Sequence, residues 1–234
     1  MAHQMLCYIC CDRRSNLSDN LIYQVIRVPA QGEWLNVRDK AIEGFKFMDT
    51  PGLVSVTLSH PFGTNLTISS QYVFPIDFIN QFDGTATTEI EKKQIEMEKL
   101  CKNTREVIKA IVEPVELAPK DTKFVVNHFL KTLPGKKNQV IDLVRDWRDK
   151  LDGTKPLIAV PVSSDQNEMV EVSYPISDFN RVIEGVSGVK SDKLDTRPIE
   201  MLNQMLLGNR LSGLVDNIYR IVQMKLIGSG LADK

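Results

Sequence analysis

The stretch Leu157-Ile-Ala-Val-Pro-Val162 is followed by the polar run Ser163–Glu168 and then by Met169-Val-Glu-Val-Ser-Tyr174. Two short apolar runs separated by a polar turn are typical of a β-hairpin. The hairpin predicts that the protein contains antiparallel sheet. It also divides the chain into a part before residue 156 and a part from residue 156 to the end.

After the hairpin, apolar residues recur at three- and four-residue steps, which is the period of a helix. Ser177 suits the N-cap of a first helix, and Thr196 with Pro198 suits the start of a second. A third helix is predicted to end near Gly228. Residues 156–234 are therefore predicted to form the hairpin and a C-terminal helical bundle.

Before the hairpin, residues 85–155 are predicted to be helical. Thr88 with Glu91 fits a capping box, and Glu113-Pro114 is a suitable end for that first helix. Asp121 is a candidate cap for a second helix, and a third carries apolar residues from Val140 to Leu151.

Residues 1–84 show β-rich runs interrupted by turn residues such as Pro51-Gly52, which predict a meander or hairpins. The fold class predicted is thus α+β, with a β-rich N-terminal part, a helical middle, the 157–174 hairpin and the helical bundle. These three regions are expected to form one or two compact domains, and no internal repeat is evident.

The composition is that of an ordinary globular protein. The 234 residues carry a net charge of −1, with 42% hydrophobic and 25% charged residues. These values exclude strongly disordered, collagen-like and highly basic proteins. No apolar run approaches the ~18 residues of a membrane span, so no membrane association is expected.

Three of the four cysteines crowd near the N-terminus, at Cys7, Cys10 and Cys11. The Cys-x2-Cys spacing, with His3 nearby, suits half of a metal knuckle, but a second ligand pair is missing. In a strand these cysteines point to both faces. We therefore predict reduced, buried thiols, no metal, and a location in the cytoplasm or in a particle assembled there.

The string Asp49-Thr50-Pro51-Gly52 follows an apolar run and resembles the switch-II motif of GTPases. In that family the aspartate reaches Mg²⁺ and the glycine amide contacts the γ-phosphate. The glycine-rich phosphate loop that such a site needs is absent upstream. The sequence therefore favours a β-turn at Pro51-Gly52, and no cofactor is predicted.

Basic residues gather between residues 131 and 150, where they form a candidate contact for nucleic acid. Aspartates interleave with them as ion-pair partners, which favours a solvated face over a phosphate-binding one. The candidate residues are Lys131, Lys136, Lys137, Arg145 and Arg148.

No catalytic motif is evident. The histidines are His3, His60 and His128, and the chain has neither a nucleophile elbow nor a His-Glu-x-x-His helix. His128 lies among Val126, Phe129 and Leu130, where a packed or partly exposed histidine is the ordinary interpretation. We therefore predict no catalytic residue and no enzymatic activity.

The C-terminal region carries more apolar residues than one helix stripe requires, which indicates a deep core helix or a subunit interface. We predict a non-enzymatic structural or assembly protein that forms a homo-oligomer or joins a multi-subunit assembly, such as a virus or phage particle. The alternatives are a nucleic-acid-binding module and an enzyme of unknown class. The candidate interface consists of Leu211, Leu214, Val215, Ile218 and Val222.

Overall fold

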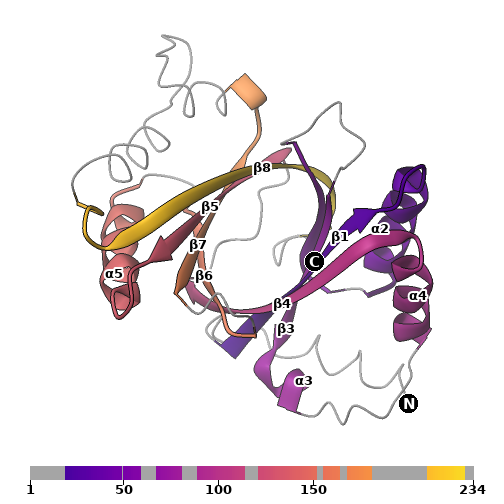
Figure 1. Cartoon of the computed structure of the whole chain (residues 1–234), viewed down its shortest axis with the longest axis horizontal. Helices are drawn as coiled ribbons and strands as arrows, with labels where there is room; N and C mark the ends of the chain where they lie inside the picture. The colour runs from indigo at the N-terminus through magenta and orange to yellow at the C-terminus, as the bar shows by residue number, and fades with distance from the viewer. Residues whose placement is uncertain are drawn as a thin grey trace.

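A computed structural model describes residues 19–48, 50–58, 67–80, 89–113, 121–151, 155–163, 168–180 and 210–229. Eight strands form a closed antiparallel barrel in the order β1-β3-β2-β8-β5-β7-β6-β4, in which β4 pairs with β1 (Figure 1). The strands are β1 (Asn20–Pro29), β2 (Gly52–Thr57), β3 (Ile68–Pro75), β4 (Cys101–Glu113), β5 (Phe124–Thr132), β6 (Leu157–Pro161), β7 (Met169–Ile176) and β8 (Val215–Ser229). The helices are α2 (Trp34–Met48), α3 (Ile76–Asn80), α4 (Glu89–Glu98) and α5 (Lys137–Asp149).

The barrel consists of two halves with the same topology. The first half has the strand order β4-β1-β3-β2, and the second has the order β8-β5-β7-β6. The first half runs β-α-β-β-α-β along the chain, which is the ferredoxin-like arrangement. The second half repeats its four strands and first helix, while residues 181–209 before β8 lie outside the described part.

The turns into α2 and α5 show that the repeat extends to single residues. Gly32 and Gly135 are 103 residues apart and both have positive φ, at 86° and 73°. Next to them, the amide of Glu33 donates to the carbonyl of Ala30, and that of Lys136 donates to Leu133, each at 3.0 Å. A shift of 103 residues therefore relates β1 and α2 to β5 and α5, although the sequence shows no repeat.

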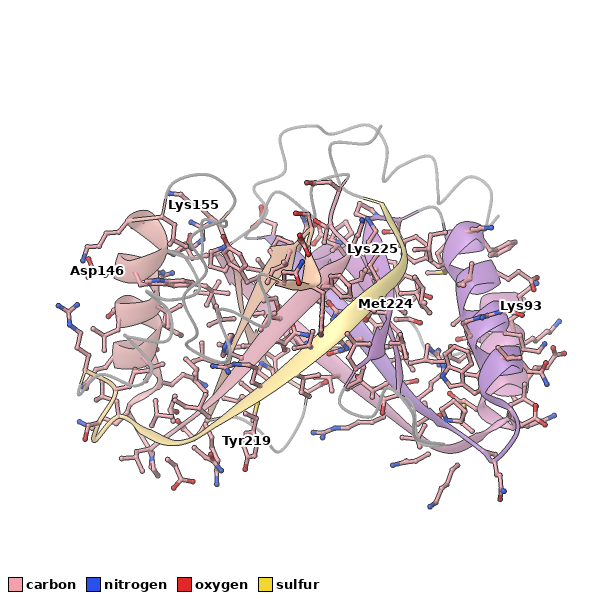
Figure 2. All side chains as sticks on the ribbon, turned by 90° about the horizontal axis from the view of Figure 1, so that it is seen from above. Lys93, Asp146, Lys155, Tyr219, Met224 and Lys225 are labelled. Carbon is pink, nitrogen blue, oxygen red and sulfur yellow. The ribbon has the colours of Figure 1, made fainter. Side chains whose placement is uncertain are left out.

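The helices cover two opposite outer faces of the barrel, with α2 and α4 on one side and α5 on the other (Figures 1 and 2). Under α2 and α4, one apolar cluster joins Val37, Ala41 and Phe45 to Val54, Ile68 and Tyr72 of the sheet. Under α5, a second cluster joins residues of that helix to β5, β6 and β7. Its fully buried members include Leu130, Val140, Val144, Ile158, Val170 and Val172.

The inner face of the barrel is partly polar. Gln24 Nε2 donates to Ser69 Oγ at 2.7 Å, and Asn127 Nδ2 donates to Gln223 Oε1 at 2.8 Å. Lys109 and Glu171 form a buried ion pair. The apolar residues beside this ion pair are Ile22, Val73, Ile111, Leu157 and Ala159.

The predicted α+β class is wrong, because the protein is mostly sheet. The helical middle contains β4 and β5 as well as α4 and α5. The last predicted helix, from Leu211 to near Gly228, is mainly the 15-residue strand β8. In contrast, β6 and β7 pair antiparallel where the sequence predicts a hairpin, and α5 lies where the third helix of the middle region is predicted.

The predicted β-rich N-terminal part also needs correction, because residues 34–48 form α2. The apolar run before Asp49 belongs to this helix, whereas the switch-II resemblance implies a strand there. Thr50 Oγ1 donates to the carbonyl of Val73 at 2.8 Å and fixes the connection into β2. Thr50 therefore has a structural role at this connection.

Candidate functional site

His128 on β5 and Arg220 on β8 form a polar pair on the outer side of the barrel wall. These two residues stand directly opposite each other in the β5–β8 ladder. Arg220 Nε donates to His128 Nε2 at 2.9 Å. His128 is only 1% exposed, so the imidazole is held in place by a charged donor and is shielded from water.

The protonation state of His128 follows from this environment. Burial, followed by the charge of Arg220, lowers the pKa of His128 from 6.5 to about 3. Burial also lowers the pKa of the Arg220 guanidinium. His128 is therefore neutral at pH 7, and because Nε2 accepts a hydrogen bond, its proton is assigned to Nδ1.

His128 Nδ1 is buried and has no hydrogen-bond partner. An N–H donor in this position costs free energy unless an acceptor reaches it. A carbonyl, enolate or phenolate oxygen of a ligand is the acceptor type that suits this donor. The nearby charge of Arg220 makes an oxygen that becomes anionic the best fit.

The strand surface beside His128 is apolar and aromatic. Val126, two residues away on the same face of β5, packs with Ile176, and Phe124, Tyr174 and Val222 surround them. The rings of Phe124 and Phe179 lie 5.2 Å apart. The polar pair thus borders an apolar and aromatic cluster.

The weak basicity of His128 defines its chemistry. An imidazole with a pKa of about 3 is a poor general base at neutral pH. A neutral imidazole can instead act as an electrophile that donates its N–H to an oxygen on which charge develops. The pair is therefore suited to oxyanion stabilisation.

The residues of the predicted interface lie on the outer side of the second half. Leu211 is buried in the cluster under α5, while Leu214, Val215 and Ile218 pack against that cluster. Val222 packs instead beside Val126 and Ile176. These residues do not share a helix, because three of them belong to β8. Their role between subunits stays a prediction.

Three of the five candidate nucleic-acid residues, Lys131, Arg145 and Arg148, form ion pairs. Lys131 pairs with Asp216 at 2.9 Å, and Arg145 Nε pairs with Glu113 at 2.7 Å. Arg148 Nε donates to the carbonyl of Pro156 at 3.0 Å. Lys136 and Lys137 stand at the start of α5. Nucleic-acid binding through this set therefore stays a prediction.

The remaining candidates of the sequence lie outside the described part of the chain. They are the possible metal ligands His3, Cys7, Cys10 and Cys11, together with Asp49 and His60. Within the described ranges, no group of three or more His, Cys, Asp or Glu side chains is placed to hold a metal ion. In the same ranges, no helix combines the length and apolarity needed to span a membrane.

Sequence reasoning missed Arg220 altogether, because it placed residue 220 on a helix. It considered His128 but interpreted it as a packed or partly exposed residue of a helical region. The signal that pairs them is the β5–β8 register, which joins residues 92 positions apart. That register is a property of the closed barrel and has no counterpart in local sequence patterns.

Solved structures share the barrel. A Fusobacterium nucleatum protein described as a "putative monooxygenase" matches with a TM-score of 0.64 and 10% identity, over 91% of this chain and 96% of that one. A Lactobacillus acidophilus protein with the same description matches with a TM-score of 0.59 and 8% identity, over 90% of this chain and 96% of that one. An "anthrone oxidase-like protein" matches with a TM-score of 0.55 and 9% identity, over 92% of this chain and 94% of that one.

At these identities the likeness shows the fold alone. No family model matches the sequence, and no curated protein matches it. The structural matches overturn the prediction of a non-enzymatic structural, assembly, virus or phage protein. The solved proteins with this barrel are described as monooxygenases and as oxidase-like.

Proposed function

We propose that the protein is an enzyme of the monooxygenase type, and that His128 and Arg220 form its oxyanion-stabilising pair. The observation that carries the proposal is the buried, neutral imidazole whose Nδ1–H has no partner beside a guanidinium. The descriptions of the solved barrels support the reaction type, and the pair supports the position of the site.

The substrate class follows from the lining of the site. Phe124, Val126 and Tyr174 offer apolar and aromatic contacts, so the body of the substrate is expected to be a planar aromatic compound. The Nδ1–H of His128 requires an oxygen acceptor on that compound. A phenol or carbonyl conjugated to an activated CH₂ group meets both requirements.

The proposed reaction oxidises this CH₂ group with dioxygen. The substrate loses a proton to solvent, and the resulting carbanion places its charge on the conjugated oxygen, where His128 and Arg220 stabilise it. One oxygen atom of O₂ becomes the new carbonyl, and the other leaves as water with the two hydrogens of the CH₂ group. The four electrons that O₂ takes up come from the substrate, so the balance requires no external reductant.

The test is oxygen consumption with anthrone as the probe. The wild-type protein is expected to consume one O₂ for each anthrone. Replacing one donor to an oxyanion costs about 10²–10³ in kcat in a well-studied case, and we expect a loss of at least tenfold in His128→Phe and Arg220→Gln. Tyr219→Phe is the control, because the ladder places residue 219 on the other face of β8 (Figure 2).

Two results would overturn the proposal. The first is the absence of oxygen uptake above the uncatalysed rate with correctly folded wild-type protein. The second is an unchanged kcat in His128→Phe. Circular dichroism of each variant checks that a loss of rate does not come from unfolding.

A further inference from the structure

Arg27 is the largest fully buried side chain of the described structure, at 1% exposure. It lies on β1, on the outer face that α4 covers. Its terminal nitrogens donate to Ser70 Oγ at 3.0 Å and to Gln94 Oε1 at 2.5 Å. Its Nε–H has no hydrogen-bond partner. Both of the hydrogen-bonded partners are uncharged groups.

No carboxylate of the described residues forms an ion pair with Arg27. The nearest one in the hydrogen-bond chain is Glu98, which Gln94 Nε2 reaches at 3.2 Å. Gln94 therefore separates the guanidinium from the acid. Burial lowers the pKa of Arg27, but a guanidinium remains charged in proteins. An unpaired buried charge is costly, so its retention calls for an explanation.

The second half shows that packing alone does not require an arginine here. The 103-residue shift places Leu130 at the position of Arg27, and Leu130 is fully buried in the apolar cluster under α5. An apolar side chain fills that place without hydrogen bonds. In the other direction, the shift places Val25 of the first half at the position of His128 in the second half. The buried polar residues of the two halves therefore stand at different positions.

The surroundings of Arg27 are aromatic. Tyr23 and Tyr72 both influence its charge electrostatically. The Tyr72 ring stacks with Phe45 at 5.9 Å and lies 6.2 Å from Phe74. A guanidinium edge is suited to a planar carboxylate, which it can bind through two parallel hydrogen bonds. The aromatic rings are suited to the apolar body that bears this carboxylate.

We propose that Arg27 binds the carboxylate of a small aromatic acid, in a second ligand site between α4 and the sheet of the first half. The Nε–H supplies one of the hydrogen bonds to this carboxylate. The site is separate from the His128–Arg220 pair, and its existence does not depend on the reaction proposed for that pair.

The test measures the thermal midpoint of the full chain in benzoate and in chloride at equal ionic strength. A saturable rise of about 5 °C is expected when benzoate is roughly 100-fold above its Kd. Gln94→Glu gives Arg27 a carboxylate of its own, so this variant is expected to fold and to lose the benzoate effect. Lys93→Gln changes the net charge equally on the outside of the same helix (Figure 2) and is expected to retain the effect.

A second measurement does not depend on stability. The Nε–H resonance of Arg27 in a ¹⁵N spectrum is expected to shift with benzoate, and Arg27→Met identifies the signal. His128→Asn must retain both responses, which distinguishes this site from the oxidation site. The proposal is overturned if benzoate and chloride give the same midpoint, or if Gln94→Glu responds to benzoate as the wild type does.

Discussion

Lys109 on β4 and Glu171 on β7 form an ion pair that spans the intervening strand β6 inside the barrel. Their side chains are 3% and 2% exposed. Ala159 on β6 is the register partner of Glu171, and Pro161 is that of Lys109. The side chains of these β6 residues are short, which lets the two long chains meet across the strand. Ser173 Oγ also donates to Glu171 Oε1 at 3.3 Å.

Removal of one partner of this pair is expected to be strongly destabilising. Lys109→Met leaves Glu171 charged and buried, which costs roughly 3–5 kcal/mol of unfolding free energy. The double variant Lys109→Met/Glu171→Met leaves no unpaired charge and is expected to regain most of that loss. Urea denaturation measures the unfolding free energy of the single and the double variant. If the double variant is no more stable than the single one, the unpaired Glu171 is not the cause of the loss.

The stability of the protein is expected to fall on mild acidification because of His128. Its folded pKa of about 3 lies below the unfolded value of 6.5, so the unfolded chain binds the proton first as the pH falls. The stabilising contribution is complete above pH 6.5 and is lost between pH 6.5 and about 3. The loss is of the order of 5 kcal/mol.

The comparison of wild type with His128→Asn isolates this contribution. The variant removes the titrating group, so its unfolding free energy is expected to depend less steeply on pH in that interval. Denaturation at closely spaced pH values gives the two slopes. Parallel curves for the two proteins would show that His128 does not titrate in this way.

Two glycines are expected to respond to alanine in opposite ways. A Cβ at Gly52 would lie 2.1 Å from the backbone oxygen of Gln71, so Gly52→Ala must move β2 away from β3. We expect a loss of about 1–3 kcal/mol, the usual range for overpacking. Gly44 lies within α2 with no atom near its added Cβ. Gly44→Ala is expected to gain about 0.5–1 kcal/mol, and thermal unfolding of both variants checks the contrast.

The duplication predicts matched effects at equivalent helix positions. Val37 in α2 and Val140 in α5 are both fully buried and are related by the 103-residue shift. Each alanine variant is expected to lose roughly 1–4 kcal/mol, and the double variant the sum, since the helices lie on opposite sides. Leu35→Ala is the control, because this side chain is 54% exposed. A large difference between the two valines would argue against equivalent packing.

The sequence predicted the elements that have one apolar face. In α5, Val140, Ile141, Val144 and Trp147 are buried at helical spacing and face a single cluster. The β6–β7 hairpin was evident because a polar turn separates two apolar runs. In both places the local pattern agrees with the tertiary environment.

The errors arose in β5 and in β8, for different reasons. Residues 125–128 of β5 are all buried, because one side faces the barrel interior and the other faces the outer layer. The alternation that marks a half-exposed strand is lost there. In β8 most side chains are half-buried or exposed, and its length of 15 residues favoured a helical interpretation. The candidate site was missed because His128 and Arg220 meet only through the pairing of these two strands.

Closure of the barrel also limits how the protein can associate. Each of the eight strands pairs with a neighbour on both sides, so most backbone amides and carbonyls of the sheet are engaged within the chain. The two longest strands extend beyond one of their neighbours: among the described residues, the ladders pair residues 101–107 of β4 with β1 alone and residues 215–221 of β8 with β5 alone. Elsewhere a second copy or a foreign peptide cannot add a strand without first opening the barrel. Pairing of the sheet with another chain is therefore limited to these two strand ends.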